Sequence, residues 1–183
     1  MYDVIGKATS IILGLLVIIL GSTTIYATKM DTQLQNHVSY YTQDFVNTSR
    51  ATGMIEKQQY EKFIKELDST GQAYRVEILH YKEKTAPVKV QRDLNGDGVM
   101  ETTTEYKVYY DTFNKEEILN TIATRDANNL TSDYAMNVGD FIKVTVVNMK
   151  PTLGRKLLGF FTGRPTTQGG QIRASYGGYI GND

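Results

Sequence analysis

A run of twenty uncharged and mostly apolar residues, from Ala8 to Ala27, most constrains what this chain can fold into. A helix of that length is about 30 Å long, which matches the hydrocarbon core of a bilayer. Lys7 and Lys29 bracket the run, and Tyr26 stands where membrane helices place an interfacial aromatic residue. We therefore predict a membrane-spanning helix in this segment.

Three interpretations of the apolar run are open on the sequence: a cleaved signal peptide, a plain single-pass anchor, or the first half of a longer helix. A signal peptide begins with a basic segment, whereas the first seven residues hold one acid, Asp3, and one base, Lys7. Cleavage after Ala27 would also interrupt a helical pattern that continues without a break. This continuation favours the longer helix.

An amphipathic stripe follows the apolar run. Its apolar residues recur at spacings of 4, 4, 3 and 4, as on one helix face: Met30, Leu34, Val38, Tyr41 and Phe45. Residues 22–52 contain no proline or glycine, and Gly53 is suited to end a helix. We predict one helix from about Tyr2 to about Arg50, roughly 70 Å long. A plain anchor has no need of so long a rigid element.

The rest of the chain predicts an α+β domain. Strand patterns with a period of two cover residues 74–81, 104–111, 140–149 and 171–180, and glycines weaken the middle of the last one. Helical patterns cover residues 56–69 and 114–123, and Asn114 is the expected N-cap of the second helix. Residues 151–163 form either a short helix or an apolar flap, and residues 126–139 are typical of a loop.

A sheet must cover its apolar face, so we expect four residues of the stripe to pack on four antiparallel strands: Leu34, Val38, Tyr41 and Phe45. The strand residues expected in this core are Val76, Ile78, Val108, Ile142, Val144 and Val146.

Composition argues against several classes of function. The chain has no cysteine, which excludes disulfides, thiolate zinc sites and cysteine nucleophiles. Lys plus Arg and Asp plus Glu both total 20, and the resulting zero net charge argues against nucleic-acid binding. With two histidines, His37 and His80, and no nucleophile-elbow pattern, we expect no enzyme and a packing role for both histidines.

Residues 93–101 contain the sharpest local motif. Oxygen-bearing groups stand at positions 1, 3, 5, 7 (a backbone carbonyl) and 9 of an EF-hand-type calcium loop, with glycine at position 6: Asp93, Asn95, Asp97, Val99 and Glu101. Thr104 occupies position 12, where a bidentate glutamate is usual. The Asn-Gly and Asp-Gly pairs also favour a bare hairpin turn. Calcium binding and a simple turn both remain open, and the two can coexist.

Taken in order along the chain, these features resemble the type IV pilin superfamily. Residues 4–50 match its long helix, apolar in the first half and amphipathic in the second. The remainder is similar to pilin-like proteins of tight-adherence (Tad) secretion systems of Gram-positive bacteria. The stretches that carry this similarity are residues 44–53 (DFVNTSRATG), 59–60 (QY), 67–71 (LDSTG) and 139–146 (GDFIKVTV).

The resemblance implies a subunit that waits in the cytoplasmic membrane until an ATPase-driven platform extracts it into an extracellular helical filament of identical subunits. Residues 1–29 would be the membrane-spanning and later filament-core helix, and residues 30–183 the extracellular α+β head. The residues that we expect in the filament core are Asp3, Ile11, Leu13, Leu16, Ile18 and Leu20.

Two features depart from the pilin pattern. Ile5 stands where pilins carry a glutamate at the fifth mature position, and no leader precedes Met1. We expect a chain that is either already mature or exported unprocessed. Asp3 is either a substitute carboxylate, paired with a neighbour's N-terminal amine, or a solvated charge at the membrane face.

Two other functions fit the sequence. One is a membrane-anchored component of a secretion or conjugation apparatus that does not polymerise. The other is a calcium-dependent surface adhesion module on a single-pass tether.

Overall fold

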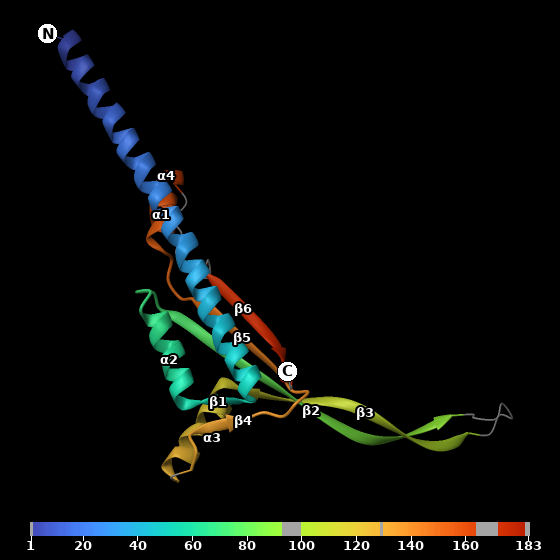
Figure 1. Ribbon diagram of the computed structural model, residues 1–183. Helices are drawn as coiled ribbons and strands as arrows, with labels where there is room; N and C mark the ends of the chain where they lie inside the picture. Colours follow the sequence, from blue (N-terminus) through green and yellow to red (C-terminus); the bar gives the residue numbers. More distant parts are fainter. Residues whose placement is uncertain (1, 93–99, 129, 164–171, 182–183) are drawn as a thin grey trace. The chain divides into compact units, whose positions relative to one another are not determined.

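The computed structural model describes residues 2–92, 100–128, 130–163 and 172–181 (Figure 1). The fold is α+β, as the sequence predicts, with a long N-terminal helix, a four-stranded antiparallel sheet and short helices between the strands. Helix α1 (Tyr2–Thr52) has 51 residues and ends two residues beyond the predicted position. Gly53 follows it with a φ of +69°, the left-handed conformation expected of a helix stop.

The main sheet contains the four predicted strands in the order β3-β2-β5-β6. They are β2 (Tyr74–Arg92), β3 (Glu101–Asn114), β5 (Phe141–Asn148) and β6 (Arg173–Tyr179). A second, two-stranded sheet pairs β1 (Met54–Glu56) with β4 (Asp133–Ala135). Strand β4 lies in the segment predicted as a loop. The prediction missed it because three residues are too few to show a period.

The short helices follow the predicted patterns. Helix α2 spans Lys57–Asp68, and α3 spans Lys115–Ala127. Asn114 caps α3 as predicted, and Glu117 returns a hydrogen bond to the Asn114 backbone N–H, which completes a capping box. Residues 151–163, predicted as a helix or a flap, contain helix α4 (Leu153–Thr162), with Thr152 as its N-cap.

The chain divides into two compact units, and each has a core of its own. The first unit comprises Met1–Thr42, Phe63–Val76 and Thr145–Ser175. Its buried apolar residues are Ala27, Val38, Phe63, Leu67, Val76, Val146, Ile172 and Ala174. The second unit comprises Gln43–Lys62, Glu77–Val144 and Tyr176–Asp183. Its core includes Phe45, Val46, Ile55, Ile78, Ile118, Ile122, Ile142, Val144 and Ile180.

Among the predicted core residues, Leu34 and Tyr41 are only half-buried, and the prediction for Val108 is wrong, because Val108 is 51% exposed. Strands β2 and β3 pair in register from Leu79 opposite Asn114 to Arg92 opposite Glu101. Strand β2 has 19 residues, whereas β5 has only eight. The Glu83 N–H already bonds the side chain of Asp140, the residue just before β5, so Thr85 and its partner Val108 lie beyond the reach of β5. The strand pattern was right, but none of the described elements covers this part of the β2–β3 hairpin.

Candidate functional site

The first half of α1 is an exposed apolar surface. Side chains such as Val17, Ile18 and Ile25 are between 62% and 69% exposed. The most apolar 18-residue window of α1 has a mean hydropathy of 2.2, and none of it is buried. Among the described residues, α1 is the one helix long and apolar enough to cross a membrane, a property that a signal sequence shares. An apolar surface of this size is stable against lipid or protein and unstable against water.

The predicted filament-core residues lie on this surface. Ile11, Leu13, Leu16 and Ile18 are between 46% and 65% exposed, and Leu20 is half-buried. Their numbering places them on two opposite sides of the helix rather than on one stripe. The side chain of Asp3, also predicted here, lies outside the described part of the structure. A helix that is apolar all round is suited to lipid, or to several neighbouring helices at once.

Hydroxyl side chains within the apolar run are satisfied inside the helix itself. Four of them donate hydrogen bonds of 2.8–2.9 Å to the carbonyl oxygen four residues earlier: Ser10, Ser22, Thr23 and Thr24. Thr28, one residue beyond the run, does the same at 2.9 Å. In hydrocarbon an unsatisfied hydroxyl is costly, and this local bond removes the cost. These polar residues are therefore compatible with an apolar environment.

The predicted calcium loop falls mostly outside the described residues. Asp93, Asn95, Asp97 and Val99 are not described, and Glu101 is the exposed first residue of β3. The flanking strands are present, and Arg92 pairs with Glu101 across the hairpin. Among the described residues no three His, Cys, Asp or Glu side chains form a cluster suited to a metal ion. Calcium binding therefore stays a prediction.

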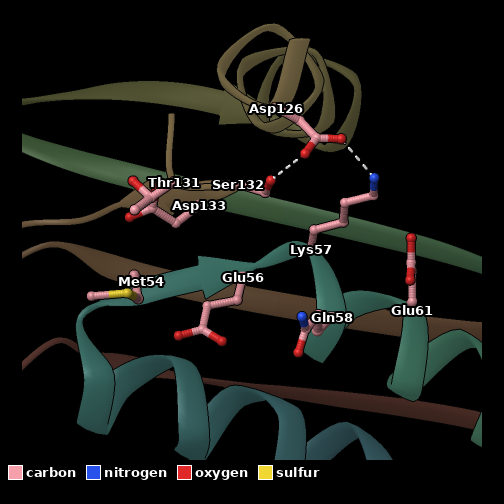
Figure 2. A pocket seen from close by; sticks show the side chains of 9 residues that line it. All are labelled: Met54, Glu56, Lys57, Gln58, Glu61, Asp126, Thr131, Ser132 and Asp133. Carbon is pink, nitrogen blue, oxygen red and sulfur yellow. Dashed lines mark hydrogen bonds and ion pairs between the residues drawn. The ribbon is translucent and has the colours of Figure 1, made fainter. Parts of the chain in front are cut away.

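An open cavity of about 640 Å³ lies in the second unit, between the β1–α2 junction and the α3–β4 connection (Figure 2). Its lining is rich in carboxylates, and includes Glu56, Glu61, Asp126 and Asp133. The Lys57 Nζ lies 2.7 Å from Asp126, and hydrogen bonding from Lys57 lowers the pKa of that carboxyl. This anionic hollow contains none of the residues that the sequence singled out.

Hydrogen bonds and ion pairs connect the walls of this hollow (Figure 2). Asp126, at the end of α3, accepts hydrogen bonds from Lys57 and from the Ser132 hydroxyl, at 2.7 and 2.6 Å. The Arg125 guanidinium nitrogen Nη2 lies 3.2 Å from Asp133 Oδ1. These contacts join α3 to the start of α2 and to β4. The paired charges are a sufficient structural explanation of the hollow.

A buried polar network surrounds His80. The His80 Nδ1 is 2.8 Å from the Tyr134 hydroxyl, and its Nε2 is 2.9 Å from Asp140 Oδ2. His80 is 1% exposed, Asp140 2% and Tyr134 9%. Burial lowers the pKa of His80, against the opposing influence of Asp140, and burial raises the pKa of Tyr134 to about 12. The ring is therefore neutral at pH 7: Tyr134 donates to Nδ1, and Nε2–H donates to Asp140.

Asp140 is the centre of this network. Its carboxylate also accepts the backbone N–H groups of Glu83, at 3.0 Å, and Asn137, at 2.7 Å. The network thereby joins β2, β4 and the start of β5. Because its members are shielded from solvent, a dissolved substrate has no access to the imidazole. Sequence reasoning expected His80 to pack and missed both partners, which lie 54 and 60 residues away.

Comparisons with known proteins return no match to a family model, to a curated protein or to a solved structure.

Proposed function

We propose that this chain is the structural subunit, or pilin, of an extracellular type IV pilus-like filament. The subunit resides in the cytoplasmic membrane before assembly and then polymerises through the apolar half of α1. The observation that carries the proposal is one continuous helix of 51 residues, exposed and apolar at its start and built into folded cores further along. Val38 and Phe45 anchor it in those cores, at 0% and 3% exposure.

Continuity of the helix is what favours polymerisation over simple anchoring. A tether functions with any linker between membrane and head, whereas a filament needs each head held rigidly on its core helix. Lipid tails are as apolar as leucine, so transfer of α1 from lipid to a bundle of equivalent helices gains packing rather than hydrophobic burial. A Cβ at Gly14 or at Gly21 would meet no neighbouring group within 4 Å, so both positions leave room for a close helix partner.

The proposed life cycle follows from the resemblance to pilins. An ATPase platform would draw subunits out of the membrane, and identical copies would be the main partner in the fibre. No catalysis is required of the chain itself. Calcium at residues 93–101 would stabilise a loop of the extracellular head.

The substitution Leu16→Asp tests this proposal. Leu16 lies near the middle of the apolar run, and a carboxylate there costs about 2.5–3.5 kcal/mol in an apolar environment. We expect it to abolish fibres in material sheared from cells, as judged by negative-stain microscopy. Gln33→Asp is the matched control, because Gln33 is exposed on the same helix beyond the apolar run. It should leave fibres unchanged.

Recovery in the membrane fraction checks that Leu16→Asp still inserts, and Leu16→Ser replaces it if insertion fails. Fibres at normal yield from an inserted variant would overturn the filament core. If the unsubstituted protein forms no fibre and remains monomeric in membranes, the non-polymerising anchor is the better description.

A further inference from the structure

Helix α4 is held tightly against α1 where the apolar run ends (Figure 1). Thr152, the N-cap of α4, donates a 2.6 Å hydrogen bond to the carboxylate of Asp31, and both residues are at most 8% exposed. A Cβ at Gly154 would lie 2.5 Å from that carboxylate and 3.0 Å from the carbonyl oxygen of Ala27. Helix α4 and the part of α1 up to Thr42 belong to the same compact unit. Only glycine permits this close approach.

The contact extends back into the apolar run. Ala27 is buried, and Thr24 and Leu20 are half-buried, while most of their neighbours are exposed. Together with Asp31 these residues recur at spacings of 4, 3 and 4, which is one face of α1. Ten residues of α4 span about 15 Å, close to the roughly 16 Å that separate residues 20 and 31 along α1. Helix α4 therefore covers this face beside the last turns of the predicted span.

The outer side of α4 is apolar and cationic. Leu153 is 70% exposed, Leu158 49% and Phe160 80%. The charged residues of α4 are Arg155 and Lys156, with no acid in the helix. On a surface that faces water, exposed leucine and phenylalanine side chains of this density are unfavourable. At the same level, Ile25 and Tyr26 lie on the sides of α1 turned away from α4 and are also more than 60% exposed. Helix α4 and this end of α1 therefore both expose apolar side chains, in different directions.

We infer that α4 is an interfacial membrane helix, docked on α1 in the leaflet next to the head. Its first residues, beside Asp31, lie at the depth of the headgroups, and its later residues, beside the last turns of the span, reach the outer part of the acyl chains. Leucine and phenylalanine side chains on such a helix enter the acyl boundary, while lysine and arginine contact anionic headgroups. A lipid surface is favoured over a protein partner because it accepts the exposed surfaces of α4 and α1 together. The helix fixes the depth at which α1 leaves the bilayer.

This inference rests on the membrane-resident stage of the proposed function and not on polymerisation. The chain contains no tryptophan, so a single introduced tryptophan reports on its own site. We would reconstitute the full chain carrying Phe160→Trp in vesicles of phosphatidylcholine and phosphatidylglycerol, with and without bromine on the acyl chains. Leu153→Trp provides a second α4 reporter in case the first variant misfolds. Ile18→Trp reports on the span, and Tyr106→Trp on an exposed site of the head, 73% exposed.

We expect blue-shifted emission and quenching by brominated lipid for the α4 reporters and for Ile18→Trp. Tyr106→Trp should emit as in water and remain unquenched. Quenching of Ile18→Trp without quenching of either α4 reporter overturns the interfacial helix and leaves the filament proposal intact. Absence of quenching at Ile18→Trp overturns the membrane stage, and the interfacial helix with it. Fibre formation is tested separately, by Leu16→Asp.

Discussion

The side-chain amide of Gln35 binds both backbone polar groups of Arg173. Its Nε2 donates to the Arg173 carbonyl oxygen at 2.9 Å, and its Oε1 accepts from the Arg173 N–H at 3.0 Å. Arg173 begins β6, which is one of the two edge strands of the main sheet. An exposed strand edge invites pairing with another chain, and α1 blocks this position with one side chain. The same helix that carries the apolar run therefore also closes part of the sheet edge.

Substitution of Gln35 should weaken this closure. We expect Gln35→Ala to lower the free energy of unfolding by about 1–2 kcal/mol, because two hydrogen bonds are lost at a partly solvated site. Denaturant unfolding followed by circular dichroism measures the change. Gln33→Ala, on the exposed side of the same helix turn, is the control and should change stability by less than about 0.5 kcal/mol. Equal stability of the two variants would show that the hydrogen bonds between Gln35 and Arg173 contribute nothing to the free energy of unfolding.

The His80 network predicts a loss of stability in mild acid. Burial lowers the pKa of His80 below its ordinary 6.5, so the unfolded chain binds a proton more readily than the folded one. Stability is then full above about pH 6.5 and falls as the pH drops below that value, with a slope of at most about 1.4 kcal/mol per pH unit for one group. Carboxylates also make the free energy of unfolding depend on pH, so the effect of His80 is measured as the difference between the unsubstituted chain and a His80 variant.

Urea unfolding of two proteins, the unsubstituted chain and His80→Gln, isolates the contribution of His80. The measurements cover pH 5 to 7, a range of about two units around the histidine pKa. Glutamine keeps a donor and an acceptor but does not titrate. We expect the variant to be less stable at neutral pH and to show the shallower slope. Parallel slopes would mean that His80 is protonated equally in the folded and unfolded states.

Periodicity in the sequence was sufficient to predict most of the fold. The uninterrupted pattern up to Arg50 predicted α1 within two residues of its end. The four strands of the main sheet were predicted because their alternation is strong. The cap of α3 was predicted from Asn114, since capping depends on side chains adjacent in sequence. These features are local, and the sequence states local features directly.

Contacts between distant residues were not predictable in this way. The pattern identifies which face Val108 occupies but not whether another strand lies beneath it. Glycines carry no hydrophobic signal, so Gly154 gave no indication of its contact with α1. The glycines of β6 were interpreted as a weakness of the strand, yet a Cβ at Gly177 would lie 2.8 Å from the carbonyl oxygen of Ile142. Close backbone approach explains that glycine, and only the structure reveals it.

Calcium binding at residues 93–101 is tested by removing two of its proposed ligands. Asp93→Ala combined with Asp97→Ala should abolish the heat of calcium binding in titration calorimetry. It should also remove any calcium-dependent rise in melting temperature, because a ligand stabilises only the state that it binds. An incomplete loop suggests a dissociation constant of about 10⁻⁴ to 10⁻³ M. Absence of both signals in the unsubstituted chain at millimolar calcium would make the segment a simple turn.

If the apolar half of α1 serves only the proposed filament core, while its second half packs in the head, the head should fold alone. A chain that starts at residue 30 loses the apolar run but keeps Val38, Phe45 and Val46, which are at most 3% exposed. Each such side chain contributes about 1.5–3 kcal/mol on burial, before conformational entropy is counted. We expect a soluble monomer with one cooperative unfolding transition. This truncation also removes Ala27, the contact of Gly154, so α4 is expected to be less ordered in it.

Phe45→Ala in the truncated chain then tests which core the stripe belongs to. Phe45 is 3% exposed, and its ring lies 6.4 Å from that of Tyr60 in an edge-to-face arrangement. Truncation of a core aromatic to alanine costs about 3–5 kcal/mol, and chemical denaturation measures the loss. Tyr40→Ala is the control, because Tyr40 is 64% exposed on the same helix. A truncated chain that stays unfolded, or that tolerates Phe45→Ala as well as Tyr40→Ala, would mean that the stripe packs on neighbouring subunits rather than within its own head.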